Sequence, residues 1–164
     1  MKTTKIAIAL ATTLAFTGLA TMPASALTVS HHVVVATPAA TIGTDDAVAI
    51  ENYKTDNASY VAAVADFRTA KQAGTGAKAA LKNAEKKYKA AAKSYGNAKK
   101  VIGKTFRDNI ASAKAVFLTE NAAATNAEQK LAAKNKFASA KSQAASNRAA
   151  ALTSLGKGPA KLKK

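Results

Sequence analysis

Residues 77–102 read AKAALKNAEKKYKAAAKSYGNAKKVI, and this stretch carries the clearest structural pattern in the chain. Alanines fill the alternate positions of a seven-residue repeat of larger apolar side chains. That repeat consists of Leu81, Tyr88, Tyr95 and Ile102. Large side chains facing alanines at heptad spacing are typical of two closely approaching helices. We therefore predict a helix from residue 77 to about residue 102, with Tyr88 and Tyr95 largely buried against the preceding helix or a second chain.

The sequence before this stretch predicts a partner helix that begins at Thr44, a permitted N-cap. Asp45 and Asp46 would then lie in the first turn, where the helix dipole favours acidic side chains. A 3–4 alternation follows, formed by Ile50, Tyr53, Asn57, Tyr60, Val64 and Phe67. An asparagine in such a seam either fixes the register of a coiled coil or faces solvent, and the sequence leaves both readings of Asn57 open.

Glycines divide the rest of the chain into segments. Gly74 and Gly76 should end the first helix, because each costs about 1 kcal/mol relative to alanine, and a short glycine-containing connection predicts an antiparallel hairpin. Gly103 should form another joint. Beyond it we favour one helix of roughly 50 residues, about 75 Å long, starting near Thr105. A capping-box spacing at residues 125–128 is the alternative, since it could start a fourth helix.

The composition supports thin helices over a thick core. The chain has 164 residues and no cysteine or tryptophan, and much of its 48% hydrophobic fraction is alanine, which favours helix but buries little area. The predicted fold is all-α: an elongated antiparallel coiled coil or three-helix bundle after an N-terminal signal peptide and disordered linker. The expected segments are a signal peptide (1–26), a disordered linker (27–43), a helical coiled-coil region (44–156) and a basic disordered tail (157–164).

The first 26 residues have the layout of a secretory signal. Lys2 and Lys5 precede an apolar stretch, residues 6–19, and Pro23 stands ahead of the small-residue site at 24–26. We expect cleavage after Ala26 and a secreted, periplasmic or envelope location. The alternative is an uncleaved anchor, although the apolar run is short for a membrane span.

Charge is distributed unevenly along the chain, whose formal net charge is +16. Residues 27–70 hold two basic and five acidic residues, whereas the chain from Lys71 onward holds 21 basic and four acidic residues, a net charge of +17. The densest group is our candidate polyanion-binding site: Lys78, Lys82, Lys86, Lys89, Lys93, Lys99, Lys100 and Lys104. Such a stripe suits nucleic acid, envelope polymers or anionic lipid surfaces. Lysine rather than arginine, asparagine or glutamine predicts little sequence preference. In the alternative reading, the lysines only solvate a thin helical protein.

No motif for catalysis or for a cofactor withstands inspection. Residues 103–105 read GKT, but the first glycine of a phosphate-binding loop would fall at Ala98. His31 and His32 are neighbours in the predicted linker, where adjacent side chains point in opposite directions and chelate a metal poorly. We therefore expect a non-enzymatic protein with no cofactor, no metal and no small-molecule substrate.

In composition the chain resembles small exported Ala/Lys-rich helical proteins of bacteria, and it shares a basic helical character with periplasmic holdase chaperones of the Skp type. A chaperone-like or scaffolding role is the main alternative. The coiled-coil seam itself could also join copies of the chain in a homo-oligomer. Membrane-surface-active helices are a further alternative. That role favours a broad face of leucine, phenylalanine and tryptophan, and the faces here are rich in alanine.

Overall fold

The computed structural model describes residues 39–162, and within that range the chain is all-α and holds no strand. Its helices are α1 (Thr44–Gln72), α2 (Ala77–Ala123) and α3 (Ala127–Leu155). The predicted all-α class is confirmed. The predicted signal peptide and residues 27–38 of the predicted linker lie outside the described residues. In the part of the chain that is described, none of the helices has the length and apolar character needed to cross a membrane.

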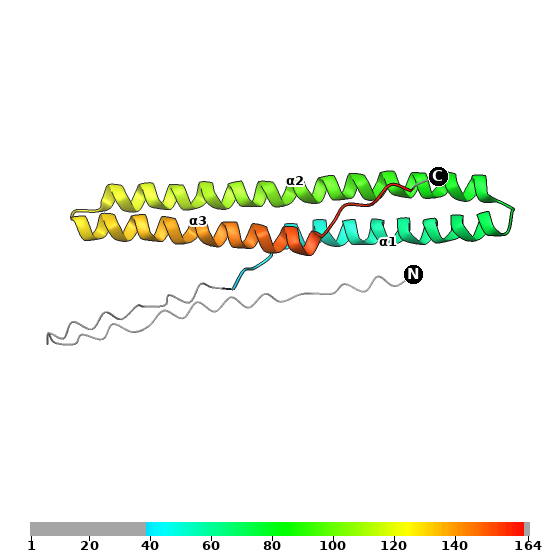
Figure 1. Ribbon diagram of the computed structural model, residues 1–164. Coiled ribbons are helices and arrows are strands. Elements are labelled where there is room, and N and C mark those ends of the chain that lie inside the picture. The colour runs from blue at the N-terminus through cyan, green and yellow to red at the C-terminus, as the bar shows by residue number, and fades with distance from the viewer. Residues whose placement is uncertain (1–38, 163–164) are drawn as a thin grey trace, which may run out of the picture. The chain divides into compact units, whose positions relative to one another are not determined.

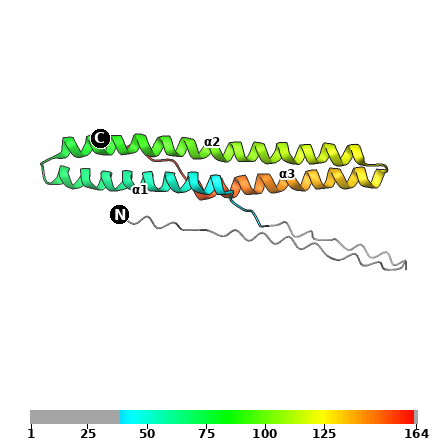
Figure 2. The ribbon, with the colours of Figure 1, turned by 180° about the vertical axis from the view of Figure 1, so that it is seen from behind.

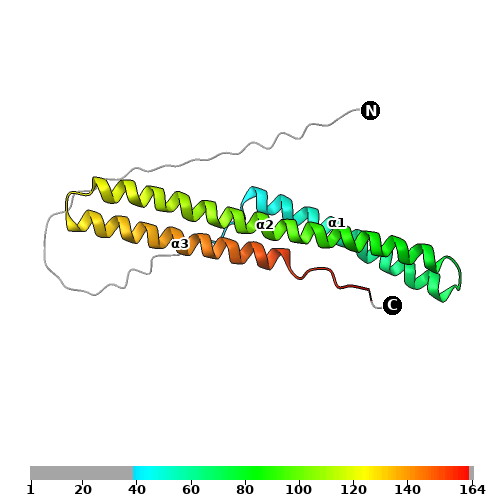
Figure 3. The same cartoon turned by 90° about the horizontal axis from the view of Figure 1, so that it is seen from above.

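Helix α2 is the common partner of the other two helices. Helix α1 packs antiparallel along the N-terminal half of α2, and α3 packs antiparallel along its C-terminal half (Figures 1 and 2). Near the middle of α2, the start of α1 and the end of α3 lie on different sides of it (Figure 3). At 1.5 Å per residue, the 47 residues of α2 extend for about 70 Å.

The core is concentrated where all three helices meet. There a buried cluster takes two residues from each helix: Ile50, Tyr53, Ala98, Ile102, Ala151 and Leu155. Toward the α1–α2 turn the core continues as a single seam, in which large residues of α1 pack beside alanines of α2. The buried members of this seam are Tyr60, Ala63, Phe67, Ala84 and Ala91. The alanines predicted to lie in this seam, at 84, 91 and 98, are therefore fully buried.

Tyr88 and Tyr95 pack against α1, on the side of α2 where the sequence pattern places them. Both are half-buried, and each contacts a tyrosine of α1 edge to face. The ring centroids of Tyr88 and Tyr60 lie 5.5 Å apart, and those of Tyr95 and Tyr53 lie 5.1 Å apart. Tyr95 also packs against the three-helix cluster and beside Gly158 of the C-terminal segment. Asn57 has intermediate exposure and lies beside this seam.

The helix boundaries correct three predictions. Gly103 does not form a joint, because α2 continues through it to Ala123. A cost of about 1 kcal/mol for one glycine is small beside the packing of neighbouring Ile102 in the three-helix core. The single helix of roughly 50 residues is also wrong, since the chain breaks at residues 124–126. Finally, Gly43 rather than Thr44 occupies the N-cap of α1.

The break between α2 and α3 lies at the position of the alternative capping box, shifted by one residue. The side chain of Asn126 accepts a hydrogen bond from the Gln129 backbone N–H at 2.8 Å. In return, the Gln129 side-chain oxygen accepts one from the Thr125 backbone N–H at 2.7 Å. These reciprocal bonds satisfy backbone donors at the start of α3, so the helix begins there.

The apolar side of α3 is formed mainly by alanines. Ala133, Ala144 and Ala151 are buried, whereas the larger Leu131 is 58% exposed. The rings of Phe117 in α2 and Phe137 in α3 stack with centroids 5.4 Å apart, a contact that the predicted single helix of roughly 50 residues would not allow.

Residues 156–162, which we call the strap, run back along the α1–α2 hairpin (Figure 1). Gly156 ends α3 with a positive φ of 70°. The hydroxyls of Tyr53 and Tyr60 donate hydrogen bonds to the carbonyls of Lys157 and Ala160, at 2.5 and 2.7 Å. The strap is therefore anchored over residues 157–160, where we expected a disordered tail. Lys163 and Lys164 lie outside the described residues.

The two tyrosine hydroxyls on α1 and the two strap carbonyls that they contact have matching spacings. Seven residues of helix span about 10.5 Å, and three residues of extended chain span about 10 Å. Tyrosines seven apart on α1 can therefore reach carbonyls three apart on the strap. Between them, a β-carbon built on Gly158 would lie 3.1 Å from Cε1 of Tyr95, so close packing there favours glycine.

Candidate polyanion interface

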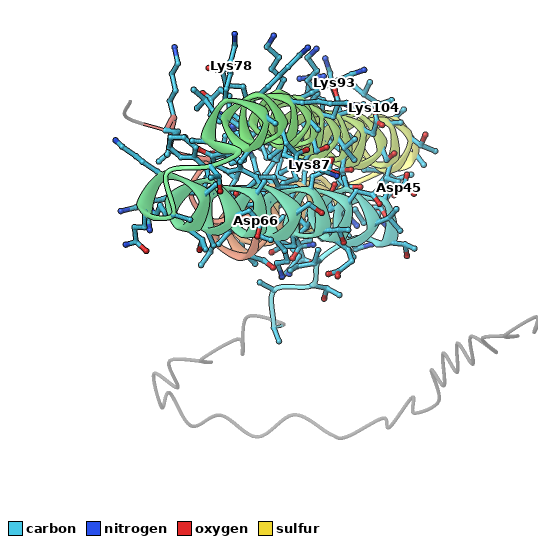
Figure 4. All side chains as sticks on the ribbon, turned by 90° about the vertical axis from the view of Figure 1, so that its right-hand side faces the viewer. Asp45, Asp66, Lys78, Lys87, Lys93 and Lys104 are labelled. Atoms are coloured by element: carbon cyan, nitrogen blue, oxygen red, sulfur yellow. The ribbon has the colours of Figure 1, made fainter. Side chains whose placement is uncertain are left out.

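All eight lysines predicted to bind polyanions lie on α2, and all are exposed. Figure 4 views the α1–α2 hairpin from its turn and shows Lys78 and Lys93 on the side of α2 that faces away from α1. Lys104 lies at the flank of α2, where it lines a groove together with Asp45 of α1. From Lys78 to Lys104 the helix rises about 39 Å. One helix thus brings the predicted residues together on a common surface.

Three of these lysines belong to a regular seven-residue repeat of basic residues on α2. Basic residues recur every seven positions at Lys86, Lys93, Lys100, Arg107 and Lys114, which we call the cationic row. All five side chains are exposed. Each of the first three lies two residues after a buried alanine of the α1–α2 seam. Two residues turn the helix by about 200°, so this part of the row lies opposite α1. Because a seven-residue repeat drifts only about 20° per repeat, the row stays on one side for about 42 Å.

Sequence reasoning left Arg107 and Lys114 out of the candidate site. A joint at Gly103 with a new helix from about Thr105 would place Arg107 and Lys114 on another element. The seven-residue spacing itself, followed past Gly103, is the pattern that could have included them. Continuity of α2 makes the row one surface.

The other candidate lysines flank the row. Lys82 and Lys89 precede row residues by one helical turn and widen the charged face. Lys99 Nζ lies 5.7 Å from the centroid of the Tyr95 ring, a cation–π contact at the edge of the seam. Lys104 forms an ion pair with Asp108 at 2.6 Å, and the hydrogen bond and charge of Asp108 raise the pKa of Lys104. Of the eight lysines, Lys104 is therefore the least suited to bind an external anion.

Acidic side chains on α1 are held away from the row. Asp46 is 4% exposed and accepts a hydrogen bond from the Thr105 hydroxyl at 2.8 Å. Asp56 accepts one from the Ser94 hydroxyl. Helix α1 has five acidic and three basic residues, whereas α2 has eleven basic and three acidic residues. The hairpin is thus polarised, with excess positive charge on the α2 side.

Among the described residues, the structure supports neither a phosphate-binding loop nor a metal site. Residues 103–105 lie inside continuous α2, and a phosphate-binding loop requires a loop ahead of its helix. Among the described residues, no group of three or more histidine, cysteine, aspartate or glutamate side chains is placed to hold a metal ion. His31 and His32 lie outside the described residues.

Comparison of the chain with protein-family models, with curated proteins and with solved structures finds no match. The functional argument therefore rests on the residues and their arrangement. The feature that this arrangement offers most clearly is an exposed, regularly spaced line of positive charge on one face of a long helix.

Proposed function

We propose that this chain is an exported, non-enzymatic helical protein that binds polyanions through the exposed cationic face of α2. One observation carries the proposal: the five exposed basic residues of the cationic row recur at heptad spacing along about 42 Å of α2. Four of its five members are lysines, compact point charges that contact phosphate or carboxylate groups without reading a base sequence. Nucleic acid and anionic envelope polymers both fit this chemistry.

Binding of this kind gains free energy from counterion release. Each lysine that meets a phosphate frees condensed cations, so affinity depends on the number of contacts and falls steeply with salt. A row with one charge every 10.5 Å or so offers several contacts at once to a single extended polymer. The exposed side chains can make them without disturbing the apolar seam on the opposite side of α2.

We further propose that the seams of α2 with α1 and α3 are antiparallel coiled coils. The buried alanines at 84, 91 and 98 and the tyrosine pairs across the α1–α2 seam support close helix approach. In this arrangement the coiled coil is a scaffold. It keeps α2 long and ordered, and therefore keeps the row in line.

Two charge-matched double variants test the proposal. Lys93→Glu/Lys100→Glu reverses two members of the row, and Lys130→Glu/Lys134→Glu reverses two exposed lysines of α3. Both variants change the net charge by the same amount. We expect the row variant to lose duplex-DNA affinity on the order of tenfold or more at low salt, and the α3 variant to lose much less.

Circular dichroism of both variants checks that helicity is retained. An equal loss of affinity in the two variants would show that only net charge matters. Unchanged DNA binding by the row variant, or no binding by the native protein, would contradict the proposal and leave the lysines with a solubilising role.

A chaperone-like or scaffolding role is the second candidate. The observation that favours it is the set of large apolar side chains left exposed toward the α2–α3 turn: Val116 and Leu118 at 54% each and Leu131 at 58%. Apolar surface of this kind can contact unfolded chains. Client binding through these residues should be insensitive to salt, and Leu131→Asn should weaken it. Polyanion binding should weaken as the salt concentration rises, and Leu131→Asn should leave it unchanged.

A further inference from the structure

A groove of about 790 Å³ runs between α1 and the strap, away from the cationic row. Its walls come from α1 between Tyr53 and Lys71 and from the strap between Lys157 and Leu162. This volume lies in the range of small-molecule sites. None of the row residues lines it.

The α1 wall changes from apolar to cationic along the helix. Asn57, Val61, Val64, Arg68 and Lys71 follow one another at spacings of four and three residues, which places them on one face. Val61 is 59% exposed although it lines the groove, so its side chain is available to a ligand. From Asn57 to Arg68 this face extends for roughly 16 Å.

The strap adds one cation at each end of the groove. Lys157 lies at the Tyr53 end. Ala160 is anchored by Tyr60, so Lys161 and Leu162 follow it toward the C-terminal half of α1. Apolar side chains from both walls line the groove, and the end that holds Arg68, Lys71 and Lys161 has the greater positive charge. Among the described residues that line the groove, none is acidic.

We propose that this groove binds a single-chain amphiphile with an anionic head, of the kind represented by a medium-chain fatty acid. The carboxylate lies at Arg68 and Lys71, where a guanidinium can form two parallel hydrogen bonds with it. The alkyl chain lies over Val64 and Val61 and gains affinity by covering apolar surface. The argument rests on charge complementarity at the end of an apolar channel and is independent of polyanion binding by α2.

Isothermal titration of the mature protein with dodecanoate, below its micelle concentration, tests the site. We expect saturable binding by the native protein. Arg68→Glu/Lys71→Glu should lower the affinity at least about tenfold, because it reverses the charge that meets the carboxylate. Lys93→Glu/Lys100→Glu, an equal charge change in the row, should leave dodecanoate affinity within about twofold.

Two further measurements keep the outcome decisive. Val61→Asp alters an exposed side chain that the fold does not need, and it should also lower dodecanoate affinity. Dodecyltrimethylammonium, with the same chain and a cationic head, should bind the native protein more weakly than dodecanoate does. The proposal is overturned if dodecanoate does not saturate, if Arg68→Glu/Lys71→Glu and Val61→Asp leave its affinity unchanged, or if the cationic amphiphile binds equally well.

Discussion

Gly96→Ala should stabilise the protein, because Gly96 lies in the interior of α2 with empty space around it. A β-carbon built on Gly96 has no neighbouring atom within 4 Å. Its backbone is helical and does not have the positive φ that would favour glycine. Nothing in the packing of α2 requires a glycine at this position.

The expected gain follows from helix propensity. Alanine is more favourable than glycine in a helix interior by about 1 kcal/mol, mainly because the unfolded alanine chain has fewer conformations to lose. A gain of that size in a domain of this length corresponds to a rise in Tm of roughly 3–5 °C. Thermal unfolding followed by circular dichroism at 222 nm measures it.

Gly158→Ala provides the matched control. There the new β-carbon would lie 3.1 Å from the Tyr95 ring, so the strap has to shift and stability should fall. The same chemical change is thus expected to have opposite signs at the two positions. A lower or unchanged Tm for Gly96→Ala would refute the reasoning, because it would mean that α2 is not a continuous helix through residue 96.

Three other predictions concern the strap and the N-terminus. Tyr60→Phe removes the hydrogen bond to the Ala160 carbonyl and should lower the free energy of unfolding by about 0.5–1.5 kcal/mol in urea denaturation, and no change would argue against an anchored strap. Burial and then the charge of Tyr95 raise the pKa of Tyr53 above its ordinary value of 10.0, so Tyr53 ionises at lower pH in the unfolded chain than in the folded one. The stability that comes from this pKa difference should be complete below pH 10 and should be lost as the pH rises through the folded pKa. Tyr53→Phe should remove that part of the alkaline loss, and a pH profile identical to the native one would contradict the assignment. Mass spectrometry of the exported protein should show a chain beginning at Leu27, and an intact N-terminus would rule out cleavage after Ala26.

Local periodicity explains which parts of the fold could be predicted. The heptads of α1 and α2 arise because the two helices contact each other repeatedly along their length. Residues such as Tyr53 and Ala91 could therefore be placed in the seam from their spacing alone. Where α2 continues and where it ends depends on contacts with other parts of the chain as well as on local sequence. Gly103 is tolerated because neighbouring Ile102 is held in the three-helix core. The break at residues 124–126 depends on the reciprocal hydrogen bonds of Thr125, Asn126 and Gln129, whose residue types also occur within the helices and therefore do not mark a helix end by themselves.

Features that depend on distant contacts could not be predicted in this way. The strap is held by hydrogen bonds between residues 104 and 100 positions apart, and its own sequence resembles a solvated basic tail. The groove beside it exists only once the strap is anchored. Exposure of the candidate lysines was predictable because lysine is rarely buried, but recognising one row required knowing that α2 continues past Gly103.

The salt dependence of duplex-DNA binding by residues 27–164, the chain without the predicted signal peptide, tests the proposed polyanion interface most directly. If the five members of the cationic row each neutralise one phosphate, a plot of log K against log salt concentration should have a slope of about −4 to −5. Lys93→Glu/Lys100→Glu should reduce that slope by about two units, whereas the α3 control variant should keep it near the native value. A flat plot, or the same slope for the native protein and the row variant, would contradict the proposal that the exposed face of α2 binds polyanions.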